Sequence, residues 1–384
     1  MKYLFLPLLF LSPALFAADK SLKTLAEVSK FKETGHYVEA ERLCKAFANR
    51  FPTQVECVTF GTTPEGRKMR ALVIADSKRG LFPGWVKKKK RHVVYFQGGI
   101  HAGEIDGKDA GFWLIRQMLE KEANPKLIEA LKNVTLVFVP VFNVDGHERF
   151  GKNNRPNQVG PEEMGWRTTS QNYNLNRDFA KADSPEMAAL HKLIQKWDPV
   201  VALDLHVTDG AQFQTEVALV MEPLFHGDKA LRDVTSQTQK TLIQRLSSRG
   251  HLAVDFYPAF EKDDDPSSGF AFYVAPPRYS QGYWSLLNRM GILVETHSWK
   301  NYETRVKVTR DTLEEVILLT AEKGSAWRGI MNEADKKSWV GEKEGVTFEV
   351  SEKNHKIDFP GYKYQRDDSE ISGKTKITYF PEQP

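Results

Sequence analysis

Three short apolar runs, far apart in the chain, constrain its fold more than any other feature. They are residues 91–96, 200–205 and 291–294, and they are rich in valine, leucine and isoleucine. Such runs are typical of strands that are buried on both faces. Residues 106–121 and 230–249 instead have apolar residues at helical spacing. Strands that alternate with helices predict an α/β fold, in which helices flank a mostly parallel, twisted mixed sheet.

Each of the three runs ends in residues that can bind a metal or transfer a proton. Two glycines interrupt the first run, and His101 and Glu104 follow; the second run ends in His206 and the third in Glu295. The carboxyl ends of such strands are where α/β proteins bind ligands. Two histidines and one carboxylate are a ligand set for catalytic zinc, which keeps a fourth position open. We therefore predict one zinc ion at His101, Glu104 and His206, with Glu295 as general base.

Each of these residues has a purely structural alternative when it is considered alone. A His-x-x-Glu pair is common in proteins that bind no metal. A histidine at a strand end can be satisfied by backbone groups, and a glutamate there can form a salt bridge. The zinc prediction therefore depends on the three strand ends meeting at one place.

Two arginines lie between the histidines, beside a stretch without regular periodicity. Arg167 follows Trp166 within an irregular segment at residues 153–173, and Arg177 follows Asn176 just after this segment. Loops of this length in a compact domain are usually functional or disordered. A guanidinium can stabilise a developing oxyanion or bind a carboxylate through two parallel hydrogen bonds. The alternative is that both arginines are ordinary surface residues.

The order of these motifs resembles the zinc carboxypeptidases of the carboxypeptidase A superfamily, the M14 metallopeptidases. The resemblance covers about residues 37–319 and rests on His101-x-x-Glu104, Asn143-Val144-Asp145-Gly146, Trp166-Arg167, Asn176-Arg177, His206 and Glu295. It implies a carboxypeptidase-like (phosphorylase/hydrolase-like) fold. It also implies that Arg167 polarises the scissile carbonyl, and that Asn176 and Arg177 hold the terminal carboxylate of a peptide substrate. The Glu-Thr-His-Ser segment at residues 295–298 is similar to that of exported bacterial members.

The chain departs from the pattern of the best-known members at three points. Asn174 stands where they have an aspartate that orients the first histidine ligand, and an amide supplies no charge to that histidine. The second histidine lies in an Asp204-Leu205-His206 segment, which is more similar to aspartoacylase-type and cytosolic members. The position of their mobile tyrosine is left open among Tyr273, Tyr279 and Tyr283.

The ends of the chain suggest an exported protein in three parts. Lys2, the apolar residues 3–11 and small residues at 17–18 are typical of a signal peptide. We predict a signal peptide at residues 1–18, a catalytic domain at 19–335 and a small β-rich C-terminal appendage at 336–384, with export to a bacterial periplasm or the medium. Alternating residues predict strands at 346–350 and 375–380 in the appendage.

Charge and cysteine content limit the partners and the compartment. The net charge of +4 on 384 residues is too small to indicate a nucleic acid as partner. No segment reaches membrane-spanning length, so no membrane association is expected after signal cleavage. Cys44, in a helical pattern, and Cys57, in a strand pattern, can form a disulfide in an oxidising compartment or remain reduced. A cysteine-based structural zinc finger is excluded.

The function predicted from these residues is that of a zinc-dependent metallocarboxypeptidase. Such an enzyme hydrolyses the peptide bond at the C-terminus of a peptide with metal-activated water. A zinc-dependent deacylase of N-acyl amino acids, or an amidase or peptidase of cell-wall peptides, is the first alternative on the same fold. A non-catalytic peptide-binding module is the second alternative, although all the chemical positions are filled.

Overall fold

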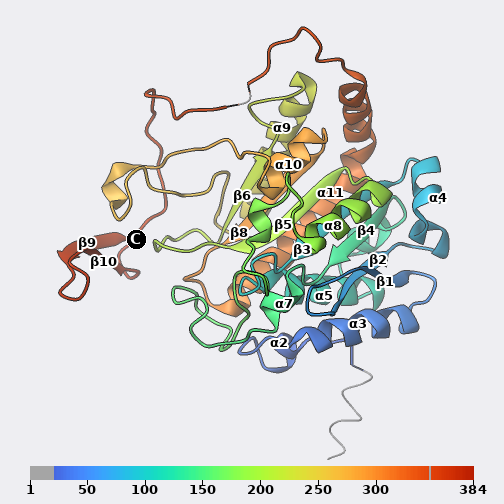
Figure 1. Ribbon diagram of the computed structural model, residues 1–384, viewed down its shortest axis with the longest axis horizontal. Coiled ribbons are helices and arrows are strands. Elements are labelled where there is room, and N and C mark those ends of the chain that lie inside the picture. The colour runs from blue at the N-terminus through green and yellow to red at the C-terminus, as the bar shows by residue number, and fades with distance from the viewer. Residues whose placement is uncertain (1–20, 346) are drawn as a thin grey trace, which may run out of the picture.

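The computed structural model describes residues 21–345 and 347–384, and its core is a mixed sheet between layers of helices (Figure 1). In this described part the main sheet has eight strands in the order β1-β2-β4-β3-β5-β8-β6-β7. The strands are β1 (Val55–Thr62), β2 (Lys68–Ile74), β3 (His92–Gly98), β4 (Val134–Val139), β5 (Val201–Val207), β6 (Val217–Glu222), β7 (Ala253–Val254) and β8 (Met290–Thr296). Strands β4, β3, β5 and β8 are parallel neighbours, and β2 and β6 join them antiparallel. The predicted α/β architecture is confirmed.

The four central strands are buried along their whole length, because helices cover both faces of the sheet. Neighbouring residues of β3 show the two layers, since successive side chains of a strand point to opposite faces. Tyr95 packs against Trp284 of α10 (Ser280–Leu286), while Phe96 stacks on Phe138, which contacts Phe112 of α5 (Asp106–Leu119). The apolar runs of the sequence are thus the centre of the core.

The remaining helical elements surround this core. The longer ones are α3 (Tyr37–Arg50), α8 (Pro185–Trp197), α9 (Lys229–Ser248) and α11 (Tyr302–Lys336). The shorter ones are α2 (Leu25–Val28), η2 (Lys78–Leu81), α4 (Pro83–Lys88), α6 (Pro125–Ala130), α7 (Val144–His147), η3 (Leu175–Arg177) and η4 (Pro266–Ser268). Helix α11 packs against α5, α9 and β3. The side chain of Asn301 caps α11 by accepting a hydrogen bond from the backbone N–H of Thr304, which explains where this helix begins.

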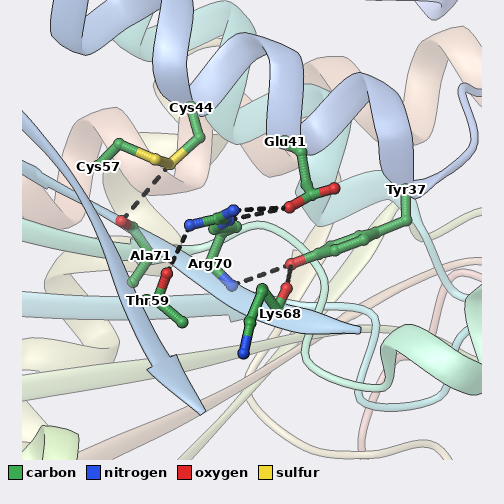
Figure 2. Close-up of a disulfide and its surroundings, with 8 residues drawn as sticks. All are labelled: Tyr37, Glu41, Cys44, Cys57, Thr59, Lys68, Arg70 and Ala71. Atoms are coloured by element: carbon green, nitrogen blue, oxygen red, sulfur yellow. Dashed lines mark hydrogen bonds and ion pairs between the residues drawn. A yellow bond between two sulfur atoms is a disulfide. The ribbon is translucent and has the colours of Figure 1, made fainter. Parts of the chain in front are cut away.

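A disulfide joins α3 to the edge strand β1, and Figure 2 shows its surroundings. Cys44 lies on the buried face of the helix, where its sulfur also contacts the carbonyl oxygen of Ala71 at 3.7 Å. Next to it, Arg70 forms an ion pair with Glu41 of the same helix, with 2.9 Å between nitrogen and oxygen. The disulfide that the sequence left open is therefore present, and it fastens the outer helix to the end of the sheet.

The C-terminal part forms a separate two-stranded sheet, the red pair of arrows in Figure 1. It consists of β9 (Lys363–Asp368) and β10 (Thr375–Phe380), so the strand expected at 375–380 is confirmed. The strand expected at 346–350 is wrong for residues 347–350, which have no regular structure and are exposed. Alternation of side chains makes a strand only where a second strand is available to pair with it.

The appendage is attached to the loops at one end of the main sheet. Phe359 packs against Phe213, Phe256 and Phe270, with ring centres 4.6–5.9 Å apart. The backbone N–H of Gln214 donates to the carbonyl oxygen of Pro360 at 3.0 Å. The appendage is thus packed onto the loop that follows β5.

Two expectations concern membranes and export. No helix in the described residues is long and apolar enough to span a membrane. The predicted signal peptide, residues 1–18, lies outside the described residues.

Candidate active site

The carboxyl ends of β3, β5 and β8 form the site, because these parallel strands lie side by side in the sheet. His206 is on β5, and Glu295 is directly opposite it on β8. His101 and Glu104 are in the turn between β3 and α5. The three distant segments that the sequence singled out therefore meet at one edge of the sheet, as predicted.

Two glycines allow the chain to leave β3 sharply and deliver His101. Gly99 has a φ of +63°, in the left-handed region that side chains other than glycine rarely adopt. A Cβ atom on Gly98 would lie 2.9 Å from both the backbone nitrogen of Lys108 and the carbonyl oxygen of Pro140. Only glycine fits this close contact between β3, α5 and the end of β4.

His101, Glu104 and His206 form a buried group with the geometry of a metal site. Their donor atoms all lie within 4.8 Å of one another. The Nδ1 atoms of His101 and His206 are 3.0 and 2.9 Å from the two carboxylate oxygens of Glu104. In tetrahedral zinc coordination, with bonds of about 2.0–2.1 Å, donor atoms stand about 3.3 Å apart. His101 Nδ1 is buried without a hydrogen-bond partner in the described part of the chain, so these residues fit a zinc ion.

The Nε2 atoms of the two histidines have different neighbours. His101 Nε2 donates to the amide oxygen of Asn174 at 3.1 Å. His206 Nε2 is 3.0 Å from a carboxylate oxygen of Asp204, whose other oxygen accepts from Gln97 Nε2 at 3.0 Å. Burial works against the charge of Asp204, but His206 and Gln97 hold the pKa of this carboxyl below its usual value. The negative charge behind the candidate metal ligands is therefore that of Asp204, which lies beside the second histidine and not beside the first.

Two arginines contact the carboxylate of Glu104. Arg167 Nη1 lies 3.1 Å from Oε1, and Arg155 Nη1 lies 2.8 Å from the same oxygen. Arg155 also donates to the carbonyl oxygens of Val207 and Thr208, at 2.9 Å each. Burial alone would raise the pKa of Glu104, but His101 and then Arg155 hold the pKa well below the usual value. Arg155 was not predicted, because nothing around it in the sequence distinguishes it from other loop arginines.

Glu295 is buried beside His206, and its Oε2 atom has no hydrogen-bond partner among the described residues. Burial raises the pKa of Glu295 to about 8; the charge on His206 counteracts the rise, and that of Glu104 adds to it. The hydroxyl of Tyr257, a second residue that was not predicted, lies nearby: its pKa is raised by burial and then by the charge of Glu295. No motif in the sequence marked this residue.

The predicted substrate-binding residues lie in the turn η3, next to His206. Asn176 is buried; its Oδ1 accepts from the backbone N–H of Ser280 at 3.1 Å, and its Nδ2 is 3.4 Å from His206 Nε2. Arg177 is half-buried, and its guanidinium carbon lies 4.2 Å from the centre of the Tyr279 ring. Tyr279 is thus the one of the three candidate tyrosines that contacts a predicted site residue. Tyr283 instead stacks on His191, and Tyr273 is 69% exposed.

The Glu-Thr-His-Ser segment fixes the neighbouring loops. Thr296 Oγ1 donates to a carboxylate oxygen of Asp106 at 2.7 Å. His297 Nε2 accepts from the backbone N–H of Phe213 at 2.8 Å, and its Nδ1 lies 3.2 Å from Thr208 Oγ1. These side chains therefore hold the ends of β5 and β8, and the loop after β5, in register around the site.

The fold and the site define the class of this protein: it is an α/β protein with a candidate mononuclear zinc centre at the carboxyl edge of its sheet. Residues 40–215 match the family model described as zinc carboxypeptidase. This segment of the chain is therefore similar to the zinc carboxypeptidase family. The matched residues include His101, Glu104 and His206 and end before Glu295.

Two relatives and one solved structure illustrate the similarity. Carboxypeptidase D from Mus musculus is 23% identical over 179 residues, which are 44% of this chain and 12% of that protein. The inactive metallocarboxypeptidase ECM14 from Saccharomyces cerevisiae is 30% identical over 122 residues, which are 30% of this chain and 27% of that protein. A metallo-carboxypeptidase from Burkholderia cenocepacia has a TM-score of 0.52 at 17% identity over 72% of this chain and 68% of that chain, a likeness of fold alone.

The matches therefore span a small part of these two relatives, and one of the relatives is named inactive. Residues 40–215 are similar to zinc carboxypeptidases as a general type of protein.

Proposed function

We propose that the protein is a zinc-dependent metallocarboxypeptidase that removes residues from the C-terminus of peptides. The observation that carries the proposal is a single constellation at the ends of β3, β5 and β8. His101, Glu104 and His206 offer three donor atoms within 4.8 Å, and the unpartnered carboxylate oxygen of Glu295 lies beside His206 within the described structure. One zinc ion at this centre supplies Lewis acidity toward a carbonyl oxygen and toward water.

Glu295 is the proposed general base. Its carboxylate takes a proton from the attacking water and returns it to the leaving amine. Arg167 is the proposed partner of the developing oxyanion, because its guanidinium lies over Glu104 at the edge of the metal site and is one-third exposed. A guanidinium at this position can contact the scissile carbonyl of a substrate that is bound next to Glu104 and Glu295.

Asn176 and Arg177 are the proposed partners of the terminal carboxylate. When Nδ1 of His206 faces the metal, its Nε2 carries the ring proton, so the amide nitrogen of Asn176, 3.4 Å from Nε2, finds no acceptor in that ring. Its N–H groups can donate to a substrate carboxylate instead. Arg177 adds a guanidinium whose bidentate geometry matches a carboxylate.

We further propose a bacterial protein that is exported to the periplasm or the medium, with a catalytic unit at 19–335 and the appendage at 336–384. The Cys44–Cys57 disulfide supports export, because disulfides persist in oxidising compartments. The attachment of Phe359 to the loop after β5 supports an appendage that is packed against the catalytic unit.

The test uses peptides with free and with amidated C-termini, followed by mass spectrometry with and without a zinc chelator. We expect stepwise loss of C-terminal residues from the free-acid peptides only, and we expect chelator to stop it. Glu295→Gln should still bind zinc but lose turnover, whereas Glu333→Gln, an exposed control on α11, should behave as wild type. Wild-type rates in Glu295→Gln would refute the mechanism. Cleavage of N-acyl amino acids but of no peptide would replace this proposal by a deacylase.

A further inference from the structure

Two arginines share one aromatic ring at the side of the candidate site. The guanidinium carbons of Arg177 and Arg278 lie 4.2 and 5.1 Å from the centre of the Tyr279 ring. Arg278 Nη2 donates to the hydroxyl of Tyr279 at 3.3 Å. Guanidinium groups interact favourably with the face of an aromatic ring, which limits the directions that they adopt. One ring therefore holds two positive charges close to each other.

This arginine pair is joined to the site by backbone contacts. The N–H of Ser280 donates to Asn176 Oδ1 at 3.1 Å, and the N–H of Phe179 donates to the carbonyl oxygen of Arg278 at 3.4 Å. Asn176 in turn lies 3.4 Å from His206. Burial lowers the pKa of Arg177, and the charges of Arg167 and Arg278 lower it further, so the three guanidinium groups act on one another.

No carboxylate of the described residues lies at ion-pair distance from either arginine of the pair. Within residues 21–345 and 347–384, the polar contacts of Arg177 and Arg278 are with a backbone carbonyl at 2.7 Å and a phenol at 3.3 Å, and neither arginine forms an ion pair. Arg155, by contrast, is paired with Glu104. Clefts lined by one sign of charge attract ligands of the opposite sign. One terminal carboxylate would occupy Arg177 and leave Arg278 without an anionic partner.

We propose that the site prefers peptides whose C-terminal residue has an acidic side chain, and that Arg278 binds the carboxylate of that side chain. Arg177 then binds the α-carboxylate of the same residue. The inference rests on the proposed carboxypeptidase function and names its substrate class, peptides that end in glutamate or aspartate. A second charge-assisted contact would strengthen the binding of such a residue further. Hydrogen bonds of this kind are about twice as strong as those between neutral groups.

The test compares two peptides that differ only in a C-terminal glutamate or glutamine, which are nearly equal in size. We expect kcat/KM of the wild-type protein to be about 10-fold or more higher for the glutamate peptide, in the range of a charge-assisted hydrogen bond. Arg278→Gln should reduce this ratio to below about 3-fold, chiefly by lowering kcat/KM for the glutamate peptide. Arg79→Gln, an exposed arginine of η2 near β1 and β2, is the matched control and should keep the preference.

Equal rates for the two peptides in the wild-type protein, or an unchanged ratio in Arg278→Gln, would overturn the inference while the carboxypeptidase proposal stands. If no peptide is cleaved, the carboxypeptidase proposal fails, and binding decides the inference. Calorimetric titration of Glu295→Gln with both peptides should then give about 10-fold tighter binding of the glutamate peptide, and adding Arg278→Gln should abolish the difference. Equal binding of the two peptides would overturn it.

Discussion

Asp204 provides the sharpest prediction about the proposed zinc centre. This carboxylate is buried on β5, 3.0 Å from His206 Nε2, while His101 has only the neutral amide of Asn174 behind it. A carboxylate partner raises the basicity of a metal-binding imidazole, and an amide does not. We therefore predict that Asp204→Asn weakens zinc binding, although the substitution changes the side chain very little in size.

The expected magnitude follows from the contacts of Asp204. Losing a partner of this kind typically lowers metal affinity 10- to 100-fold, or about 1.4–2.7 kcal/mol. The asparagine amide can accept the ring N–H of His206, but it then turns its own N–H groups toward Gln97 Nε2, which is also a donor. Gln97 can reverse its amide only by giving up the hydrogen bond that it accepts from Tyr95. The loss should therefore lie toward the upper end of this range.

The assay is the zinc dissociation constant, measured by competition with a chromophoric chelator at one pH. Asn174→Asp should strengthen zinc binding by placing a charge behind His101, and the double variant Asp204→Asn/Asn174→Asp should return toward wild type. Asp233→Asn, an exposed residue of α9, is the control. A folded Asp204→Asn protein with the zinc affinity of the wild type would refute the reasoning.

Two further predictions concern stability. His251 contacts Glu216 and Asp311 at 2.6 and 2.9 Å, and its pKa is raised to about 9, first by the hydrogen bond with Asp311 and next by that with Glu216. Because this pKa exceeds the unfolded value of about 6.5, the contribution is complete below pH 6.5 and is lost as pH rises through 9; it amounts to about 3 kcal/mol at most. Urea unfolding at pH 6 and pH 9.5 should show the loss in the wild type and little of it in His251→Gln; equal losses in both proteins would contradict the assignment. Reducing the Cys44–Cys57 disulfide should lower the free energy of unfolding by about 3 kcal/mol, since its sequence separation is 13 residues. Unfolding with and without reductant measures this, and coincident curves would show that the bond adds no stability.

The sequence was most informative where a residue stands at the carboxyl end of a buried strand. His206 and Glu295 could be predicted because the positions of β5 and β8 determine where their side chains lie. Arg155 and Tyr257 could not, because they reach the site from long loops whose path depends on tertiary contacts such as those of Arg155 with the carbonyl oxygens after β5. The strand that was wrongly predicted over residues 347–350 has the same cause, since pairing partners are not visible in a local pattern.

The packing of Phe359 has a practical consequence for anyone who shortens this protein. Phe359 contacts Phe213, whose backbone N–H binds His297, two residues after Glu295. A protein cut at residue 335 would expose the ring of Phe213 to water and loosen the loop that borders the end of β8. Such a protein would retain every metal-binding and catalytic candidate, yet the loop after β5 would be less ordered, so low activity after truncation would be no sign that those residues are inert.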